Sequence, residues 1–252
     1  MKVLFITQED PIYVAEFWEE FLKFKNELKT IGIDVTGLVS LDPLGKSKKA
    51  SLFKRVYEMY GSFGTLKVGI RYIVAILKKR SIKRFAENLD TKFLNVRRIH
   101  SSEFIQFASR NDLIISVAAS RKFKPSLLNA PKYGCINIHS GPLPKYQGMM
   151  PVFWQMKDGK KRIGITIHKM NEEIDKGDIL YQKFIDISDC DTLDKAIKKT
   201  KKAGAKMMYE FLKDFERYYN NPKTNNKESA TYFSFPDKNA VREFVKTGRK
   251  LI

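Results

Sequence analysis

The chain opens with apolar and polar positions in the order strand, helix, strand. Residues 2–7 and 34–39 are short runs of β-forming apolar residues. Between them, 15–29 carries an apolar side chain every three or four residues, as one face of a helix does, and Gly32 ends the pattern. The apolar positions are Phe17, Phe21, Phe24 and Leu28. A strand–helix–strand unit of this length is typical of the start of a parallel sheet.

The same alternation continues along the rest of the chain. Further strands are predicted at 93–99, 113–117, 134–138, 164–170 and 179–187. Helices are predicted at 101–108, at 126–128 and from Thr192 to about Tyr219. The pattern favours an α/β fold: a three-layer Rossmann-like parallel sheet with helices on both faces.

The first turn lacks the glycine-rich fingerprint of dinucleotide-binding folds. Gln8, Glu9, Asp10 and Pro11 follow the first predicted strand, with no glycine among them. A nucleotide cofactor held on that turn is therefore not expected.

The stretch from Lys46 to Arg84 changes the picture because it is strongly basic. It holds twelve Lys and Arg residues against one acid, Glu58, and supplies +11 of the net charge of +19. Such an excess attracts the phosphates of nucleic acids, nucleotides or anionic lipids. Solvated helix faces in a lysine-rich proteome would give the same charge, so charge alone specifies no partner.

Two helices are predicted within this basic stretch. In the second, Lys67, Arg71 and Lys78 lie apart from an apolar stripe. The stripe consists of Leu66, Ile70, Ile73, Val74 and Leu77. A stripe of this kind usually packs against the body of a protein. The alternatives are a helix that lies on a membrane surface and an arm that binds phosphate.

Composition places the chain among soluble globular proteins. Its 252 residues, 43% of them hydrophobic, can build one full core. Two cysteines, Cys135 and Cys190, are too few for a disulfide framework or a four-cysteine zinc site. The chain shows no signal peptide and no apolar run that could span a bilayer. We therefore expect a cytoplasmic protein without stable membrane insertion.

Asn137 and His139 are the residues with the clearest chemical potential. They flank Ile138 at the end of a predicted strand, so their side chains point to the same face. Open α/β sheets bind ligands at this carboxyl edge, and the Gly- and Pro-rich segment 140–148 predicts an irregular loop beside it. An amide beside an imidazole suits the stabilisation of an oxyanion. A purely structural polar pair is the alternative.

This segment resembles the folate-dependent formyltransferases. That family carries Asn-x-His, a Ser-Leu-Leu-Pro-x-Tyr-Arg-Gly-like loop, then Gly-x-Thr-x-His and an Asp-x-Gly turn. The matching segments here are Asn137 to His139, Ser140 to Gly148, Gly164 to His168, and Asp175 to Gly177. The resemblance is strongest over about 110–190 and covers 1–215 more weakly. Gly141-Pro142 and Gln147 depart from the usual loop, which puts acceptor contacts in doubt.

The resemblance implies a chemistry as well as a fold. A formyl group moves from the co-substrate N10-formyltetrahydrofolate to a primary amine through a tetrahedral oxyanion. Asn137 and a protonated His139 would bind that oxyanion. Asp175 would stabilise the His139 cation and take the amine proton through water. No metal is implied. His168 matches the motif histidine, but its alternation with Thr166 equally suits a packed role or a supporting role behind the catalytic residues, so it stays outside the catalytic set.

The resemblance also implies where the pterin ring of the folate lies. One contact is the loop after the strand that precedes Asn-x-His, and the other is the turn that begins at Asn171. The loop residues are Ser120, Arg121, Lys122 and Phe123. Such contacts are largely main-chain in the family, so a solvated loop is the alternative for Arg121 and Lys122.

Three classes of amine acceptor are considered: glycinamide ribonucleotide, the aminoacyl end of initiator tRNA, and a nucleotide-linked amino sugar. Glycinamide ribonucleotide is disfavoured, because the enzymes that use it are shorter and have a Gly-rich first turn. Transfer-RNA formylases carry a C-terminal β-barrel, whereas only about 35 residues follow the long helix here. The first residues and the ending at 232–236 resemble sugar N-formyltransferases, so the expected partner is a nucleotide-linked amino sugar.

We accordingly predict a catalytic domain at 1–215, of the methionyl-tRNA formyltransferase type, and a C-terminal extension at 216–252 that packs on it. Nucleic acid remains the alternative partner, and a homodimer is open. A basic RNA- or membrane-binding module without turnover is the non-enzymatic alternative.

Overall fold

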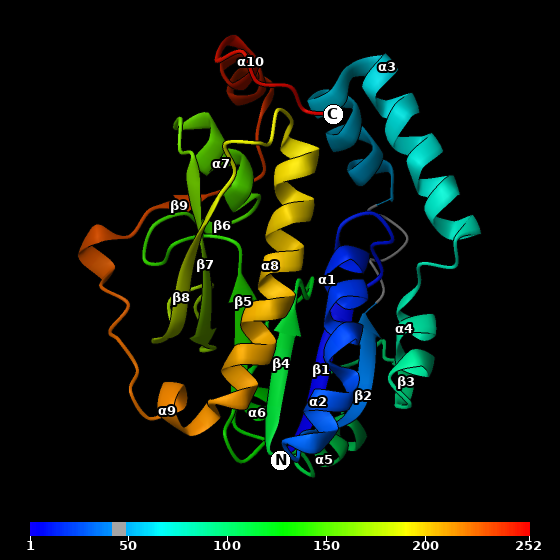
Figure 1. The fold of residues 1–252 in the computed structure, drawn as a ribbon, viewed down its shortest axis with the longest axis vertical. Helices are drawn as coiled ribbons and strands as arrows, with labels where there is room; N and C mark the ends of the chain where they lie inside the picture. The colour runs from blue at the N-terminus through cyan, green and yellow to red at the C-terminus, as the bar shows by residue number, and fades with distance from the viewer. Residues whose placement is uncertain (42–48) are drawn as a thin grey trace.

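A seven-stranded sheet forms the centre of the molecule (Figure 1). The computed structural model describes residues 1–41 and 49–252. The strands, in the order in which they lie side by side, are β3 (Lys92–Asn95), β2 (Asp34–Leu41), β1 (Lys2–Gln8), β4 (Leu113–Val117), β5 (Cys135–His139), β7 (Arg162–Lys169) and β8 (Ile179–Asp186). The strands from β3 to β5 pair in parallel.

β7 is the one strand of this sheet that runs in the opposite direction. It pairs antiparallel with β5 and with β8, so the sheet is mostly rather than fully parallel. A short turn can join β7 to β8 because antiparallel neighbours need no crossover helix. The reversal also places residues of β7 directly opposite the end of β5.

Helices cover both faces of the sheet, which confirms the predicted three-layer α/β fold. Val3 and Phe5 of β1 pack under α1 (Val14–Phe21), α4 (Ile82–Asn88) and α8 (Leu193–Lys213). Leu4 and Ile6, on the other face, pack against α5 (Ser102–Ala108) and α6 (Pro125–Leu128). Successive strand side chains alternate between faces, so one buried strand supplies both cores. In Figure 1, α1 and α8 lie in front of the sheet.

The remaining elements gather at one end of the sheet. They are α7 (Pro151–Lys157), α10 (Lys238–Lys246) and a small second sheet in which β6 (Gln147–Gly148) pairs with β9 (Tyr232–Phe233). Phe153 of α7 stacks on Phe244 of α10, with 4.9 Å between ring centres. These contacts join the C-terminal residues to the loop that follows β5.

Several predicted helices are shorter or interrupted. The helix expected at 15–29 consists of α1, a 3₁₀ turn at Leu22–Phe24 and α2 (Lys25–Thr30). The long C-terminal helix divides at Asp214 into α8 and α9 (Phe215–Tyr219). The side chain of Thr192 accepts the backbone N–H of Lys195 and caps α8, as a residue at a helix N-terminus should.

The basic stretch differs from its prediction. α3 (Lys49–Leu77) bends at Gly61, which has a positive φ of 65°, and α4 follows it along the chain. Lys46 and Lys48, at the start of the basic stretch, lie outside the described residues. The apolar stripe was expected to pack on the body, and this is wrong. All five of its side chains are exposed, from 42% for Val74 to 75% for Leu77.

An ion pair explains why α3 turns its apolar stripe outward. Arg71 faces the body and lies 3.0 Å from Asp194, a carboxylate that is only 5% exposed. Gly64 and Ala75 share that buried side of the helix. None of the helices that the structure describes is both long and apolar enough to cross a membrane.

The Arg71→Ala variant tests this account of α3. It removes one of two cations beside the buried Asp194, and Lys198 remains 3.0 Å away. We expect the free energy of unfolding to fall by about 1–2 kcal/mol, less than for a fully buried pair because Arg71 is partly exposed. Denaturant titration measures this loss. Lys67→Ala on the same helix is the control, and an equal loss there would contradict the account.

Candidate functional site

The end of β5 and the neighbouring β7 bring three polar side chains together. Asn137 and His139 lie on the same face of β5. Asn137 is directly opposite His168 of β7, and His139 is opposite Thr166. The Nδ2 of Asn137 is 3.2 Å from Nε2 of His168. The reversed strand β7 thus places His168 beside Asn137, which fits the supporting role that the sequence left open for it.

Asp175 lies between the two histidines. Its Oδ2 is 3.5 Å from Nδ1 of His139, and its Oδ1 is 3.5 Å from Nε2 of His168. Oδ2 also accepts the backbone N–H of Gly148 at 2.9 Å. All three side chains are buried, with Asp175 8% exposed. One carboxylate therefore links β5, β7 and the loop after β5.

The ring nitrogens of the histidines have distinct partners. Nε2 of His139 is 2.8 Å from the carbonyl oxygen of Tyr146, so this nitrogen carries a proton. Nδ1 of His168 is 2.7 Å from the carbonyl oxygen of Lys169 and donates there. Nε2 of His168 is then left to accept one hydrogen of the Asn137 amide. The second amide hydrogen of Asn137 remains available to a ligand.

Burial and charge set the protonation states of the pair. Burial lowers the pKa of His139 below its usual 6.5, and Asp175 opposes this shift only in part. Burial would raise the pKa of Asp175, but His139, His168 and the Gly148 N–H outweigh it and lower that pKa to about 2. At neutral pH the site therefore holds an ionised Asp175 beside a neutral His139.

The loop from Ser140 to Gly148 is fixed by side chains of β7 and β8. Thr166 donates its hydroxyl to the carbonyl oxygen of Gly141 at 2.7 Å and accepts the N–H of Leu143. Gln182 donates to the carbonyl oxygen of Leu143 at 2.9 Å. A Cβ at Gly141 would lie 2.7 Å from Nε2 of His139, so any side chain there would press on the ring. The departure from the family loop at Gly141 is thus compatible with the histidine.

The C-terminal segment completes the site. Thr231 accepts the N–H of Tyr146 through its hydroxyl and the N–H of Gln147 through its carbonyl oxygen, both at 2.8 Å. Asn225, buried, donates to the carbonyl oxygens of Asp175 at 2.9 Å and of Gly177 at 3.0 Å. Asp175 has a positive φ of 57°, which few residues other than glycine adopt. Asn225 therefore holds Asp175 in a conformation that costs energy.

The residues proposed to contact folate divide into two places. Ser120 to Phe123 follow β4, which neighbours β5, and so flank the carboxyl edge. The Ser120 hydroxyl is buried without a hydrogen-bond partner among the described residues. Phe123 is 3% exposed and packs in the core, so only its backbone can face a ligand.

Neighbouring side chains hold this loop in place. Arg121 donates to the carbonyl oxygen of Arg97, and Nε2 of His100 is 3.2 Å from that of Lys122. Asn171 lies elsewhere: the N–H of Met170 binds the carbonyl oxygen of Cys135 at the start of β5. The structure thus places Asn171 near the opposite end of β5 from His139.

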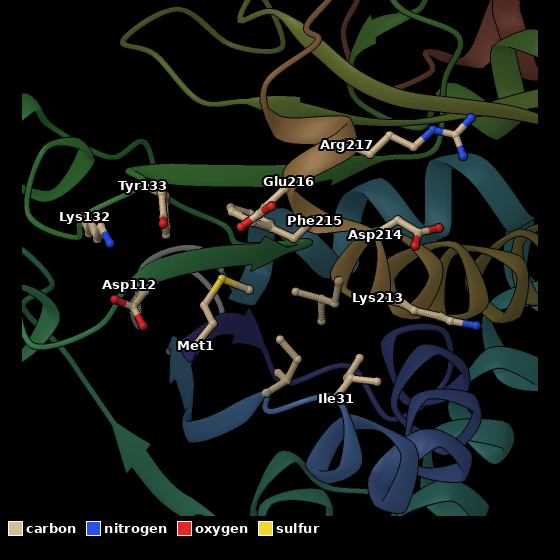
Figure 2. A pocket seen from close by; sticks show the side chains of 12 residues that line it. Met1, Ile31, Asp112, Lys132, Tyr133, Lys213, Asp214, Phe215, Glu216 and Arg217 are labelled. Atoms are coloured by element: carbon tan, nitrogen blue, oxygen red, sulfur yellow. The ribbon is translucent and has the colours of Figure 1, made fainter.

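A separate cavity of about 640 Å³ opens at the amino ends of the strands (Figure 2). Met1, Asp112 and Tyr133 line it where β1, β4 and β5 begin. In Figure 2 the charged side chains of Lys213, Asp214 and Arg217 lie on the right of the view, and those of Asp112 and Lys132 lie on the left. This cavity lies at the sheet edge opposite His139.

Sequence reasoning missed two residues of the site, Asn225 and Thr231, and left His168 outside the catalytic set. His168 carried a signal, because its alternation with Thr166 allowed it to face a neighbouring strand. Asn225 and Thr231 carried none, since each lies in a polar stretch far along the chain from its partner. Among the described residues, no group of His, Cys, Asp or Glu is arranged to hold a metal ion.

Known proteins share both sequence and fold with this chain. A family model described as formyl transferase matches residues 75–212. The methionyl-tRNA formyltransferase of Caldicellulosiruptor saccharolyticus is 37% identical over 160 residues, which cover 62% of this chain and 51% of that protein. The chain thus spans about half the length of the curated relatives it matches.

Two solved structures resemble the fold over most of the chain. A sugar N-formyltransferase from a Shewanella species has a TM-score of 0.57 at 20% identity, over 93% of this chain and 76% of that one. An N-formyltransferase from Helicobacter canadensis, solved with folinic acid and dTDP-3-aminofucose, has a TM-score of 0.55 at 19% identity, over 100% of this chain and 84% of that one.

The Asn225→Ala variant tests the support of Asp175. It leaves two buried carbonyl oxygens without their donor, so we expect the free energy of unfolding to fall by about 1–3 kcal/mol. The amide resonance of Gly148 should also shift, because its acceptor Asp175 moves. The control is Asn221→Ala, whose side chain binds an exposed carbonyl oxygen of Arg217. An unshifted Gly148 resonance in Asn225→Ala would show that Asn225 does not position Asp175.

Proposed function

Because this chain belongs to the formyl transferase family, we propose that it moves a formyl group from N10-formyltetrahydrofolate to a primary amine. The observation that carries this proposal is the buried contact of Asp175 with both His139 and His168, beside Asn137 at the sheet edge. The amine attacks the formyl carbon, and the carbonyl oxygen becomes an oxyanion. Collapse of that intermediate returns the amine as a formamide and releases tetrahydrofolate.

Asn137 is the proposed donor to the oxyanion. Its amide is held by His168, which leaves one hydrogen to point at the developing negative charge. A donor that is already oriented stabilises such a charge without reorganising during the reaction. His168 is accordingly proposed to act through Asn137 and Asp175 as a positioning residue, since its two nitrogens are occupied by protein groups.

His139 and Asp175 are proposed to accept the proton of the attacking amine. The sequence hypothesis used a protonated His139, but burial lowers the pKa of this ring and favours its neutral form. The neutral ring carries its proton on Nε2, so the lone pair of Nδ1 faces the Asp175 carboxylate. The pair can therefore take up one proton from the amine through water, and then give it to N10 of the departing folate.

The loop from Ser120 to Phe123 is proposed to hold the pterin ring. Its buried, unpartnered Ser120 hydroxyl supports this, because a ligand could supply the missing hydrogen bond. The backbone of the loop is fixed by Arg121 and His100, which suits main-chain recognition. Asn171, near the other end of β5, has weaker support as a folate contact.

The acceptor is proposed to be the amine of a nucleotide-linked sugar. The fold likeness to an N-formyltransferase solved with dTDP-3-aminofucose extends over the whole chain, including the segment that carries Asn225 and Thr231. The aminoacyl end of initiator tRNA is the second candidate. It is favoured by the sequence identity to methionyl-tRNA formyltransferases and by the net charge of +19.

A transfer assay tests the proposed function. Purified protein and N10-formyltetrahydrofolate would be offered dTDP-, UDP- and GDP-linked amino sugars and charged initiator tRNA, and product masses would be measured. We expect a formylated sugar nucleotide, with the rate lowered about 100-fold or more in Asn137→Ala, His139→Ala and Asp175→Ala. A near wild-type rate in His139→Ala would remove the mechanism.

The pH dependence of the rate tests the protonation states. If neutral His139 accepts the proton, the rate falls as the pH drops through a pKa below 6.5. In Asp175→Asn the charge that raises the His139 pKa is lost, so this acid limb should move to lower pH while the rate declines. Histidines usually titrate between about pH 6 and 8. A wild-type rate that decreases over this range as the pH rises would contradict a neutral His139.

Salt dependence separates the two acceptors. A tRNA contacts many cations at once, so its binding should weaken by about 0.7–0.9 log units per contact for each log unit of salt. A sugar nucleotide offers two phosphates, and its apparent affinity should change little. Lys78→Glu with Lys79→Glu should then leave sugar-nucleotide turnover within a few-fold. A steep dependence together with formylation of tRNA would favour the second candidate.

A further inference from the structure

The second half of α3, Phe63–Leu77, presents a continuous apolar stripe to solvent. In order around the helix, its side chains are Ile73, Leu66, Leu77, Ile70, Phe63 and Val74, all at least 42% exposed. Gly64 and Ala75 lie on the opposite side and are buried. Figure 1 shows this half of α3 at the outer edge of the molecule. Six large apolar side chains on one exposed helix face mark an interaction site.

The stripe cannot turn inward without breaking a buried contact. Arg71 leaves α3 between Lys78 and the buried Gly64, and it lies 3.0 Å from Asp194 at the start of α8. Rotating the stripe onto the body would carry the guanidinium into solvent and remove this partner of a carboxylate that is 5% exposed. The outward direction of the stripe is thus fixed by an ion pair.

Lysines lie along one border of the stripe and beyond the end of α3, and they lack carboxylate partners among the described residues. Lys67 and Lys78 follow Val74 around the helix, along one border of the stripe. Lys79 and Lys83 lie just beyond the end of α3. In contrast, Arg80 is paired with Glu16 and Glu19. The surface therefore joins exposed apolar side chains to free positive charge.

We propose that the Phe63–Leu77 face of α3 docks on an anionic lipid bilayer, with its apolar stripe in the interface and its lysines at the headgroups. Helices that lie on membranes have this composition, an apolar face bordered by Lys and Arg. The lysine stems reach along the stripe while their ammonium groups stay in water. At 1.5 Å per residue the segment is about 22 Å long, which suits a helix lying on a bilayer rather than one crossing it.

Charge favours lipid over the other occupants. A second copy of this chain would bring two basic stretches of +11 together, and like charges oppose such contact. The phosphates of a nucleic acid could bind the lysines, but they would leave the six apolar side chains exposed to water.

Co-sedimentation with vesicles tests the proposal. The full chain would be mixed with vesicles of phosphatidylcholine alone, or of equal parts phosphatidylcholine and phosphatidylglycerol. We expect binding to the anionic vesicles at least about tenfold stronger than to the neutral ones. Leu66→Ser with Ile70→Ser, and separately Lys67→Glu with Lys78→Glu, should each weaken that binding about tenfold or more.

Matched controls distinguish binding through this surface from non-specific hydrophobic adsorption and from the proposed enzyme activity. Phe184→Ser with Val245→Ser removes two apolar side chains that are 49% and 52% exposed outside α3, and binding should stay within about twofold. Formyl transfer without vesicles should be unchanged in both α3 variants, since none of the replaced side chains lies in the site. Vesicle binding is measured independently of catalysis, so it tests this proposal even if the protein shows no formyl transfer.

Three results would overturn the proposal. One is binding to anionic vesicles that is unchanged in the Leu66→Ser with Ile70→Ser variant, which would show that charge alone drives the binding. Another is no vesicle binding together with a dimer, seen by sedimentation velocity, that this pair dissociates. The third is no vesicle binding together with tRNA binding that depends on Lys67 and Lys78.

Discussion

One buried carboxylate organises the functional end of this molecule. Asp175 lies 3.5 Å from each of two histidines that come from adjacent strands, and it accepts the N–H of Gly148 from the loop between them. An ionised carboxylate this deeply buried needs a hydrogen-bond donor close by, and the Gly148 N–H supplies one to Asp175. The arrangement of β5, β7, their loop and the segment at Asn225 therefore depends on satisfying Asp175.

The reversed strand and the C-terminal segment make that arrangement possible. Because β7 runs antiparallel to β5, His168 lies opposite Asn137. The turn at 170–178 follows directly after β7 and carries Asp175 back to both histidines. Asn225 and Thr231 then fasten the backbone at Asp175 and Tyr146. The small second sheet of β6 and β9 and the contact of α7 with α10 stabilise the same loop. The site is thus built by residues from 137 to 231.

Local patterns predicted those parts of the structure that local physics decides. The apolar run of β1, the alternation around Ile138 in β5 and the start of α8 at Thr192 depend on near neighbours, and they were predicted correctly. The direction of β7 and the support of Asp175 by Asn225 depend on pairings between distant residues. The stripe of α3 was misassigned because periodicity shows that a helix has an apolar face, whereas the Arg71–Asp194 pair decides where that face points.

The protonation state of His139 tests the central claim most directly. Nitrogen-15 NMR of histidine-labelled protein resolves the proton on each ring nitrogen as the pH changes. Burial of the His139 ring favours its neutral form at pH 7, with its proton on Nε2 toward Tyr146 and a pKa below 6.5. In Asp175→Asn that pKa should fall further. A ring with protons on both nitrogens at neutral pH would contradict this account of the site.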